Sequence, residues 1–591
     1  MKKHKLLSVI AVTTGLLLLN ACSEEFLEIT PNGSLDESVL ATSDGVEALL
    51  IGAYSMIDGI DDSFGWEAAT SGWVYGSIRG MEANKGTFSG DQPDINPMQS
   101  FAESATNPYL NAKWRSCFEG VSRCNSTIVT AATALENGAI EQAEHDSFVN
   151  QAKALRGWYH FELFRIFGDL SSGLYLPYVD ENTDQSELTN EVDIRANIIA
   201  DLTAGTDLDL DMGGIGRFNK TVSQVFLAKA QMQLFGNYPA ALTLLSEVES
   251  TGRKPNGDAI GLASLYGEIF DLENRNFIES VYTVQYSVND NSGGYNGGWG
   301  EVLNFPYKGG ASPGGCCGFF TPSQDFVNSF RTDANGLPFV DLAAGTFSYN
   351  DEQVKNDQGV AVDDDTYTEY TGRLDPRVDW SAGRRGIPYW DWGEHSGTDW
   401  LRDQSYSGPY SPKKQVYKQE QEGASYTEVG NWTSGYTSNG YRMIRFADVL
   451  LLKAECEAET GTGDFGFAEV NLIRARAANP AGFVMEDDGS GPAANYVVAE
   501  YTVPFASGTE AMVAIKFERK LELGQEGHRY YDLQRWGDVL TEGNRILDHE
   551  KSMPWGALLY DANATVGPED VTLPVPQRQI DLMLGRLVQN R

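Results

Sequence analysis

The spacing of apolar side chains along the chain predicts a largely helical protein. Over residues 147–167, apolar and aromatic positions recur at helical spacing, which indicates one long helix. Residues 221–248 contain two such stretches, separated by Gly236 and Pro239. Glycine is favoured just after a helix and proline in the first turn of the next one, so we expect a helix, a tight turn and a second helix. Close approach of these helices is favoured by the small residues Ala228 and Ala230.

A second helix pair is predicted over residues 447–460 and 466–478. Paired antiparallel helices are typical of tetratricopeptide repeats, but their period of roughly 34 residues is not sustained between the two pairs. Two segments, about 287–320 and about 349–437, are instead rich in Gly, Ser, Asp, Asn and aromatic residues and lack helical periodicity. Long loops on a rigid frame commonly carry function, so we expect the ligand face in these two insertions.

The first residues have the pattern of an export signal. A basic start, MKKHK, precedes an apolar run over residues 6–19 that is short for a transmembrane helix, which predicts a signal peptide over residues 1–21. The following LNAC sequence resembles a lipobox, which implies a lipid-modified Cys22 at the start of a body spanning residues 22–591. A secretory signal with an incidental cysteine is the alternative. The acidic stretch Ser23-Glu24-Glu25 resembles the surface-export signal of Bacteroidetes lipoproteins.

Charge and composition narrow the choice of ligand. The chain has 44 Lys and Arg against 83 Asp and Glu, a formal net charge of −39, which disfavours binding to nucleic acid or to anionic lipid headgroups. We therefore expect contact with a membrane only through the lipid anchor. The sequence also contains 12 Trp, 27 Tyr and 62 Gly, a combination that predicts shaped loops carrying flat apolar surfaces. Such surfaces suit carbohydrate.

Several segments in this order resemble the SusD/RagB family, the glycan-binding lipoproteins of Bacteroidetes. They are Phe26-Leu27 and Pro31 after the lipobox, WRSCFEGVSRCN (114–125), AKALRGWYHFELFRIFGD (152–169), YRMIRFADVLLLKA (441–454), EVNLIRAR (469–476), IKFERKLELGQEGHRYYDLQRW (515–536) and LPVP (573–576). The resemblance spans essentially the whole chain. It implies a mostly α fold, with tetratricopeptide-like helix pairs packed against a large irregular ligand-binding portion. It also implies a place on the outer membrane as a cap on a SusC-type TonB-dependent transporter.

Aromatic residues in the loops are the strongest candidates for ligand contact. Tryptophan within a helix stripe is usually a core residue, whereas tryptophan flanked by glycine in a loop has fewer neighbours to bury it. We expect the ligand to contact Trp73, Tyr295, Trp299, Trp390 and Trp392, with Trp66 and Arg384 as lesser candidates. The alternative for each is local packing inside a large loop region. Arginines at 373, 377, 384, 385 and 402 could form a cationic patch near Trp390.

Catalytic, cofactor and metal sites find little support in the sequence. Carboxylate pairs for glycoside hydrolysis could be drawn from Asp391 and Glu394 or from residues 363–365, but such pairs arise by chance in a chain this acidic. Phosphate-loop and C-x-x-C motifs are missing, so we expect no catalysis, no cofactor and no metal. The charged residues in 515–536 are expected to form a scaffold of ion pairs.

The cysteines after Cys22 fall into two groups. Cys117 and Cys124 lie two helical turns apart, too far for a disulfide, and are expected in the core. Cys316 and Cys317 are adjacent within a glycine-rich loop and could either close a vicinal disulfide or remain two free thiols.

The leading hypothesis is a non-catalytic surface lipoprotein that captures an oligosaccharide or polysaccharide and passes it to a SusC-type transporter. The alternatives are a glycoside hydrolase or lyase, and a peptide-binding uptake protein like the RagB branch of the family. Loop aromatics would serve peptides nearly as well as sugars.

Overall fold

The computed structural model describes residues 40–59, 65–307, 312–423, 425–428, 433 and 435–591. The expected signal peptide over residues 1–21, the candidate lipidation site Cys22 and the acidic stretch over residues 23–25 lie outside the described residues.

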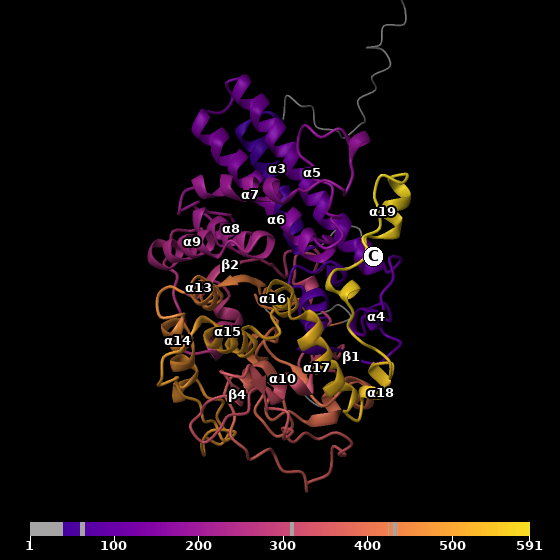
Figure 1. The fold of residues 1–591 in the computed structure, drawn as a ribbon, viewed down its shortest axis with the longest axis vertical. Helices are drawn as coiled ribbons and strands as arrows, with labels where there is room; N and C mark the ends of the chain where they lie inside the picture. Colours follow the sequence, from indigo (N-terminus) through magenta and orange to yellow (C-terminus); the bar gives the residue numbers. More distant parts are fainter. Residues whose placement is uncertain (1–39, 60–64, 308–311, 424, 429–432, 434) are drawn as a thin grey trace, which may run out of the picture.

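Helices packed side by side make up one half of the molecule (Figure 1). The first group follows the chain order: α3 (Ser43–Ser55), α5 (Pro108–Glu136), α6 (Gln142–Phe167), α7 (Arg195–Ala204), α8 (Lys220–Phe235) and α9 (Tyr238–Thr251). The second group consists of α13 (Phe446–Thr460), α14 (Phe467–Ala477), α15 (Gly508–Leu523), α16 (Arg529–Trp536) and α17 (Val539–Lys551). Helix α13 packs against both α9 and α15, so it joins the two groups although nearly two hundred residues separate it from α9.

Both predicted helix pairs are confirmed, with ends close to those expected. Helix α8 ends at Gly236, whose φ of 59° is left-handed, and the side chain of Asn237 caps the start of α9 by accepting from the backbone N–H of Ala240. Pro239 lies in the first turn of α9, where proline is favoured because its missing N–H would have no partner inside the helix. The side chains of Ala228 and Ala230 are fully buried. The expectation of a mostly helical fold built from helix pairs is therefore correct.

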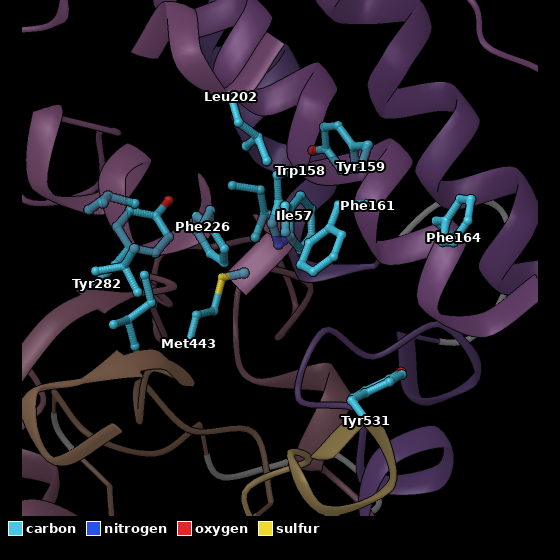
Figure 2. Packing of buried hydrophobic residues seen from close by; sticks show 14 of the residues in the cluster. Ile57, Trp158, Tyr159, Phe161, Phe164, Leu202, Phe226, Tyr282, Met443 and Tyr531 are labelled. Carbon is cyan, nitrogen blue, oxygen red and sulfur yellow. The ribbon is translucent and has the colours of Figure 1, made fainter. Parts of the chain in front are cut away.

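Aromatic side chains fill the core between these helices (Figure 2). Trp158 and Phe161 of α6 lie close to Phe226 of α8, and Met443, just before α13, packs into the same cluster. Trp158 is therefore a core residue, as its place in a helix stripe predicts. Within the described residues, no helix combines the length and apolarity needed to cross a membrane.

The other half of the molecule is built from short elements and long connections, as expected for the two insertions (Figure 1). The strands form antiparallel pairs: β1 (Ala83–Gly86) with β3 (Phe319–Pro322), β2 (Ser280–Thr283) with β8 (Arg442–Arg445), β4 (Val340–Asp341) with β5 (Thr346–Phe347), and β6 (Ala382–Gly383) with β7 (Ser411–Pro412). The short helices of this half are α4 (Ile95–Gln99), α10 (Gln324–Asn328), α11 (Val378–Ser381), α12 (Gln404–Ser407) and α18 (Gly556–Leu559). The short helix α19 (Gln577–Leu582) instead lies near the first helix group and bonds to Asn111 of α5 (Figure 1).

A buried network of ion pairs joins the two halves. Its centre is Glu522 of α15, whose carboxylate pairs with the guanidinium groups of Arg377, Arg445 and Arg476. Burial alone would favour the neutral acid, but the three arginines outweigh burial and hold the pKa of Glu522 well below its ordinary value. Since these arginines come from the loop portion, β8 and α14, the network fixes the loop portion on the helices. The predicted ion-pair scaffold is confirmed.

Candidate functional site

Three aromatic rings form a column at the surface of the loop portion. The ring of Tyr295 stacks on that of Trp299, with centroids 5.5 Å apart and an interplanar angle of 27°. Trp299 in turn stacks on Trp66, at 5.7 Å and 25°. Exposure falls along the column, because Tyr295 is 64% exposed, Trp299 is half-buried and Trp66 is buried. We call these three residues the aromatic column.

Short local elements hold the column in place. Trp299 begins the 3₁₀ turn Trp299–Glu301, which packs against the turn Gly65–Glu67 that carries Trp66. The ring of Tyr436 meets Trp299 edge-on at 5.0 Å. In the loop before Tyr295, Asp290 accepts hydrogen bonds from Ser287, Ser292 and Asn296, which lower the pKa of its carboxyl. The exposed ring of Tyr295 therefore rests on a fixed support.

A groove of about 500 Å³ forms a second candidate surface. Its aromatic wall consists of Trp380 and Trp390, whose rings meet edge-on with centroids 5.2 Å apart. Phe483 and Met485 also line the groove, and Met485 is exposed. Trp390 has a φ of 54°, a conformation that bulky residues rarely adopt and that concentrates at functional sites. The volume lies within the range of small-molecule pockets.

Charged groups at this groove can bond to hydroxyl groups of a ligand. Lys413 is buried in its wall and donates to the carbonyl oxygen of Pro388 at 2.9 Å, and burial lowers the pKa of its ammonium to about 7. Lys418 pairs with Asp271 at 2.6 Å. Glu268, Asp391, Glu420 and Asp487 complete the charged lining. We call this surface the Trp390 groove.

Trp380 was missed by the sequence analysis. It follows Asp379 in the short helix α11 and has no glycine beside it, so its neighbours in sequence resemble those of a core tryptophan. Its indole N–H donates to the carbonyl oxygen of Gly482 at 2.8 Å, a contact with a residue far along the chain. The one feature of the sequence that could have identified Trp380 as a candidate ligand contact is its place inside the insertion 349–437.

Other predicted site residues lie deeper than expected. Trp73 is 1% exposed and packs edge-on against Phe319 and Phe320 of β3, so its ring offers no face to a ligand. Trp392 is half-buried and its indole N–H donates to the carbonyl oxygen of Tyr417 at 2.9 Å. For these two residues, packing explains the side chain without a ligand.

Two of the five arginines expected to form a patch near Trp390 are buried in internal ion pairs. Arg384 is buried and forms two hydrogen bonds of 2.7 Å with the carboxylate of Asp379. Arg377 is fully buried in the ion-pair network described above. Both guanidinium groups form ion pairs with buried carboxylates, so neither is available for direct contact with an anionic ligand.

The cysteines are placed as the sequence allowed. Cys316 and Cys317 form a vicinal disulfide, which decides between the two alternatives left open by their spacing. Cys117 and Cys124 are both buried on α5 and unbonded.

Two of the candidate catalytic acids, Asp391 and Asp364, accept hydrogen bonds from neighbouring loop residues. The carboxylate of Asp391 accepts from the backbone N–H groups of Gln419 and Glu420. Hydrogen bonds from Thr366 lower the pKa of Asp364, whereas a general acid needs a raised pKa. Burial raises the pKa of Asp357 to about 6, but this residue does not line the groove and bonds to Gln404.

Comparison with known proteins agrees with this architecture. Residues 278–591 match the SusD family. The SusD-like protein P2 of Formosa agariphila is 24% identical over 596 residues, which cover 98% of this chain and 97% of that protein. Among solved structures, a laminarin-binding SusD-like protein superposes with a TM-score of 0.62 at 18% identity, covering 93% of this chain and 99% of the other. Surface glycan-binding protein A from Bacteroides thetaiotaomicron, solved in complex with laminarihexaose, gives a TM-score of 0.60 at 20% identity, with the same two coverages. The chain belongs to the SusD family.

Proposed function

We propose that this protein is a non-catalytic glycan-binding lipoprotein of the cell surface, which captures an oligosaccharide or polysaccharide and delivers it to a SusC-type TonB-dependent transporter. Two proteins of the same fold, described above, are named for binding laminarin or were solved with laminarihexaose. Anchoring through Cys22 rests on the lipobox pattern, and the transporter partner rests on the family.

The observation that carries the glycan proposal is the aromatic column. An exposed ring supported from below by two further rings presents a flat apolar face that is already in position when a ligand arrives. A sugar ring can release water from its C–H face by stacking on such a surface. Each hydrogen bond between the protein and a sugar hydroxyl then contributes only about 0.5 to 1.5 kcal/mol net, because it replaces a hydrogen bond that the hydroxyl made to water. Hydrogen bonds therefore select the sugar, and stacking supplies much of the affinity.

The Trp390 groove would extend this binding surface. It combines the two features typical of ligand pockets, an apolar aromatic wall and a few polar groups at fixed positions. Trp390 and Trp380 would contact the ligand, while Lys418 and the lining carboxylates would bond to hydroxyl groups.

The test is calorimetry of the wild-type protein with a panel of soluble oligosaccharides, laminarihexaose included, and with a mixture of short peptides as the rival ligand class. We expect heat of binding from at least one glycan and none from the peptides. A reducing-sugar assay on the same glycans should detect no release of new ends over hours. Turnover of any glycan would replace the proposal with a hydrolase or lyase, and binding of peptides alone would replace it with peptide uptake.

A further inference from the structure

Acidic side chains outnumber basic ones in the lining of the Trp390 groove. Among the described residues, the lining contains five carboxylates and two ammonium groups, so it is negative by three charges when both lysines are protonated. They are Glu268, Asp271, Asp391, Glu420 and Asp487 against Lys413 and Lys418. No arginine of the described chain belongs to this lining. A ligand in the groove therefore meets mainly negatively charged acceptors.

Both lysines of the lining are already engaged within the protein. The ammonium of Lys418 pairs with Asp271 at 2.6 Å. Lys413 is buried, and besides its bond to a backbone carbonyl its ammonium lies over two aromatic rings, 5.3 Å from the centroid of Trp380 and 5.1 Å from that of Tyr389. An acidic group on a ligand would have to compete with these contacts to gain a cationic partner.

The arginines of the surrounding insertion do not offset this charge. Besides the two that are buried in internal ion pairs, Arg402 pairs with Asp91, and Arg385 donates to carbonyl oxygens within residues 361–364. Arg373 is exposed but does not line the groove. The cationic patch that the sequence suggested is therefore not part of the groove.

More carboxylates lie next to the lining. Glu486 is the residue between Met485 and Asp487, which both line the groove. Partial burial raises the pKa of the Glu486 carboxyl, and four nearby carboxylates raise it further: those of Glu394, Asp488, Glu369 and Asp487. A cleft lined by charges of one sign concentrates ions of the opposite sign and repels ions of the same sign.

We propose that the Trp390 groove selects its ligand by charge: it takes sugar units that are neutral or carry an ammonium group, and it rejects units that carry sulfate or carboxylate groups. This inference rests on the proposed function and narrows the class of glycan that the groove receives. An ionised carboxylate can only accept hydrogen bonds, so it suits hydroxyl and ammonium donors and repels another anion. An ammonium group gains further from the faces of Trp380 and Trp390.

The first test measures the electrostatic potential of the groove without any glycan. Met485→Cys places a thiol at an exposed position of the lining, whereas the free thiols of Cys117, Cys124 and Cys456 are buried. The thiol is reacted with two methanethiosulfonate reagents, one carrying trimethylammonium and one carrying sulfonate, and the wild type gives the background rate. A potential of about −1 kT per unit charge favours the cationic reagent about sevenfold, relative to the same rate ratio with 2-mercaptoethanol.

Leu584→Cys is the matched control, because Leu584 is exposed and the charged residues of 578–586 are two arginines and one aspartate. This thiol should show no preference for the cationic reagent. Adding Glu420→Gln and Asp487→Asn to Met485→Cys removes two exposed carboxylates of the lining, and should reduce the preference. Equal rate ratios for Met485→Cys and Leu584→Cys would overturn the proposal.

The second test compares glycans that differ in charge on one backbone. Calorimetry with laminarihexaose and its sulfated form, and with chitohexaose and its deacetylated form, gives two matched pairs. We expect sulfation to weaken binding about tenfold or more at low ionic strength and less at high ionic strength, because salt screens exposed charges. Deacetylation, which creates ammonium groups, should strengthen binding. Both differences should shrink in the protein that carries Glu420→Gln and Asp487→Asn.

Sulfated laminarihexaose that binds as tightly as the neutral form, and that loses this affinity in Trp390→Ala, would also overturn the proposal. If no glycan binds at all, the proposed function fails, while the reagent rates still decide the sign of the potential in the groove. Failure of the charge selection is therefore distinguishable from failure of glycan capture.

Discussion

Gly120 of α5 lies directly against the ring of Tyr159 of α6: a Cβ added at Gly120 would fall 2.4 Å from the Cζ atom of that ring. The ring cannot easily move, because it is fully buried and its hydroxyl donates to the carbonyl oxygen of Ala53 at 2.7 Å. The absence of a side chain at position 120 thus sets how closely α5 and α6 approach.

Gly120→Ala should therefore destabilise the protein, although alanine is the better helix former. Overpacking costs about 1 to 3 kcal/mol, whereas the gain in helix propensity is about 1 kcal/mol at most. We expect a lower free energy of unfolding in urea. Gly52→Ala is the matched control, because Gly52 lies inside α3 with nothing within 4 Å of its added Cβ. That variant should be stabilised by about 0.5 to 1 kcal/mol. Equal stability of the two variants would show that the Tyr159 contact does not limit helix packing.

The aromatic column predicts a large loss of affinity when its upper rings are truncated. Trp299→Ala and Tyr295→Ala should each weaken binding of the cognate glycan about thirtyfold or more, because truncating an aromatic anchor typically costs 2 kcal/mol or more. Tyr295→Ala should leave the melting temperature unchanged, since that side chain is largely exposed. Calorimetry and thermal melting measure the two effects.

Phe235→Ala is the control for the column, because Phe235 is an exposed aromatic residue at the end of α8, away from the loop portion. It should bind glycan as the wild type does. If Tyr295→Ala also keeps wild-type affinity for a glycan that binds the protein, the column is not the contact surface.

The Trp390 groove makes a separate prediction about ligand length. If the groove extends the site, Trp390→Ala should weaken binding of long oligosaccharides more than that of short ones, because only a long ligand would reach both surfaces. Affinities for a ladder of oligosaccharides of one linkage type, measured for Trp390→Ala and Trp299→Ala, test this. An equal loss at every length in Trp390→Ala would indicate that one surface alone holds the ligand.

Glu82 predicts a change in stability between mildly acidic and alkaline pH. Burial raises the pKa of its carboxyl from an ordinary value of 4.5 to about 7, against the opposing effects of a backbone hydrogen bond and nearby cations. Between pH 4.5 and pH 7 the carboxyl of Glu82 is protonated in the folded state and ionised in the unfolded state, so the folded state binds more protons. The stability that this group contributes is therefore fully present below pH 4.5 and is lost as the pH rises through 7.

Glu82→Gln removes this titration while keeping an oxygen that can accept from the N–H of Gln525. Relative to the wild type, the variant should therefore be more stable at pH 8.5 than at pH 5, by about 1 to 3 kcal/mol. Urea unfolding at both pH values measures the difference. Glu136→Gln, an exposed change at the end of α5, should show no such pH dependence. A stability difference for Glu82→Gln that stays constant from pH 5 to 8.5 would contradict the shifted pKa.

Cys22→Ala tests the predicted lipid anchor. Without the acylated cysteine, we expect no incorporation of labelled fatty acid and release of the protein from membranes in cells that lack the transporter. Cys456→Ala, at a buried thiol of α13, should still be labelled and membrane-bound. Retention of Cys22→Ala on such membranes would show that another feature tethers the protein.

Sequence patterns predicted the helices better than the site, for a physical reason. The pair α8 and α9 is specified locally, by a period of apolar residues and by Gly236 and Pro239 between them. The exposure of a loop tryptophan depends instead on segments far away in the chain. Trp73 lies in a stretch rich in glycine and serine, yet β3 covers it from almost 250 residues away.

The same long-range dependence explains the error at Arg384 and the omission of Trp380. Arg384 is neutralised by Asp379, and the residue types of the segment do not specify this pairing. Trp380 joins the groove through Gly482 and Trp390, neither of which is a neighbour in a regular element. Residue type and local spacing identified the irregular segments, but only tertiary contacts decide which face of a ring is free.

The stack of Trp299 on Trp66 has a consequence for the order in which the protein gains activity. The column needs residue 66 from the start of the chain, residue 299 from the middle and the edge of Tyr436 beyond them. A fragment that ends before residue 436 lacks part of this support, and a fragment that begins after residue 66 lacks the base of the stack. The aromatic column therefore forms only where these distant segments meet, and cannot be cut out as a smaller module for affinity reagents or sensors.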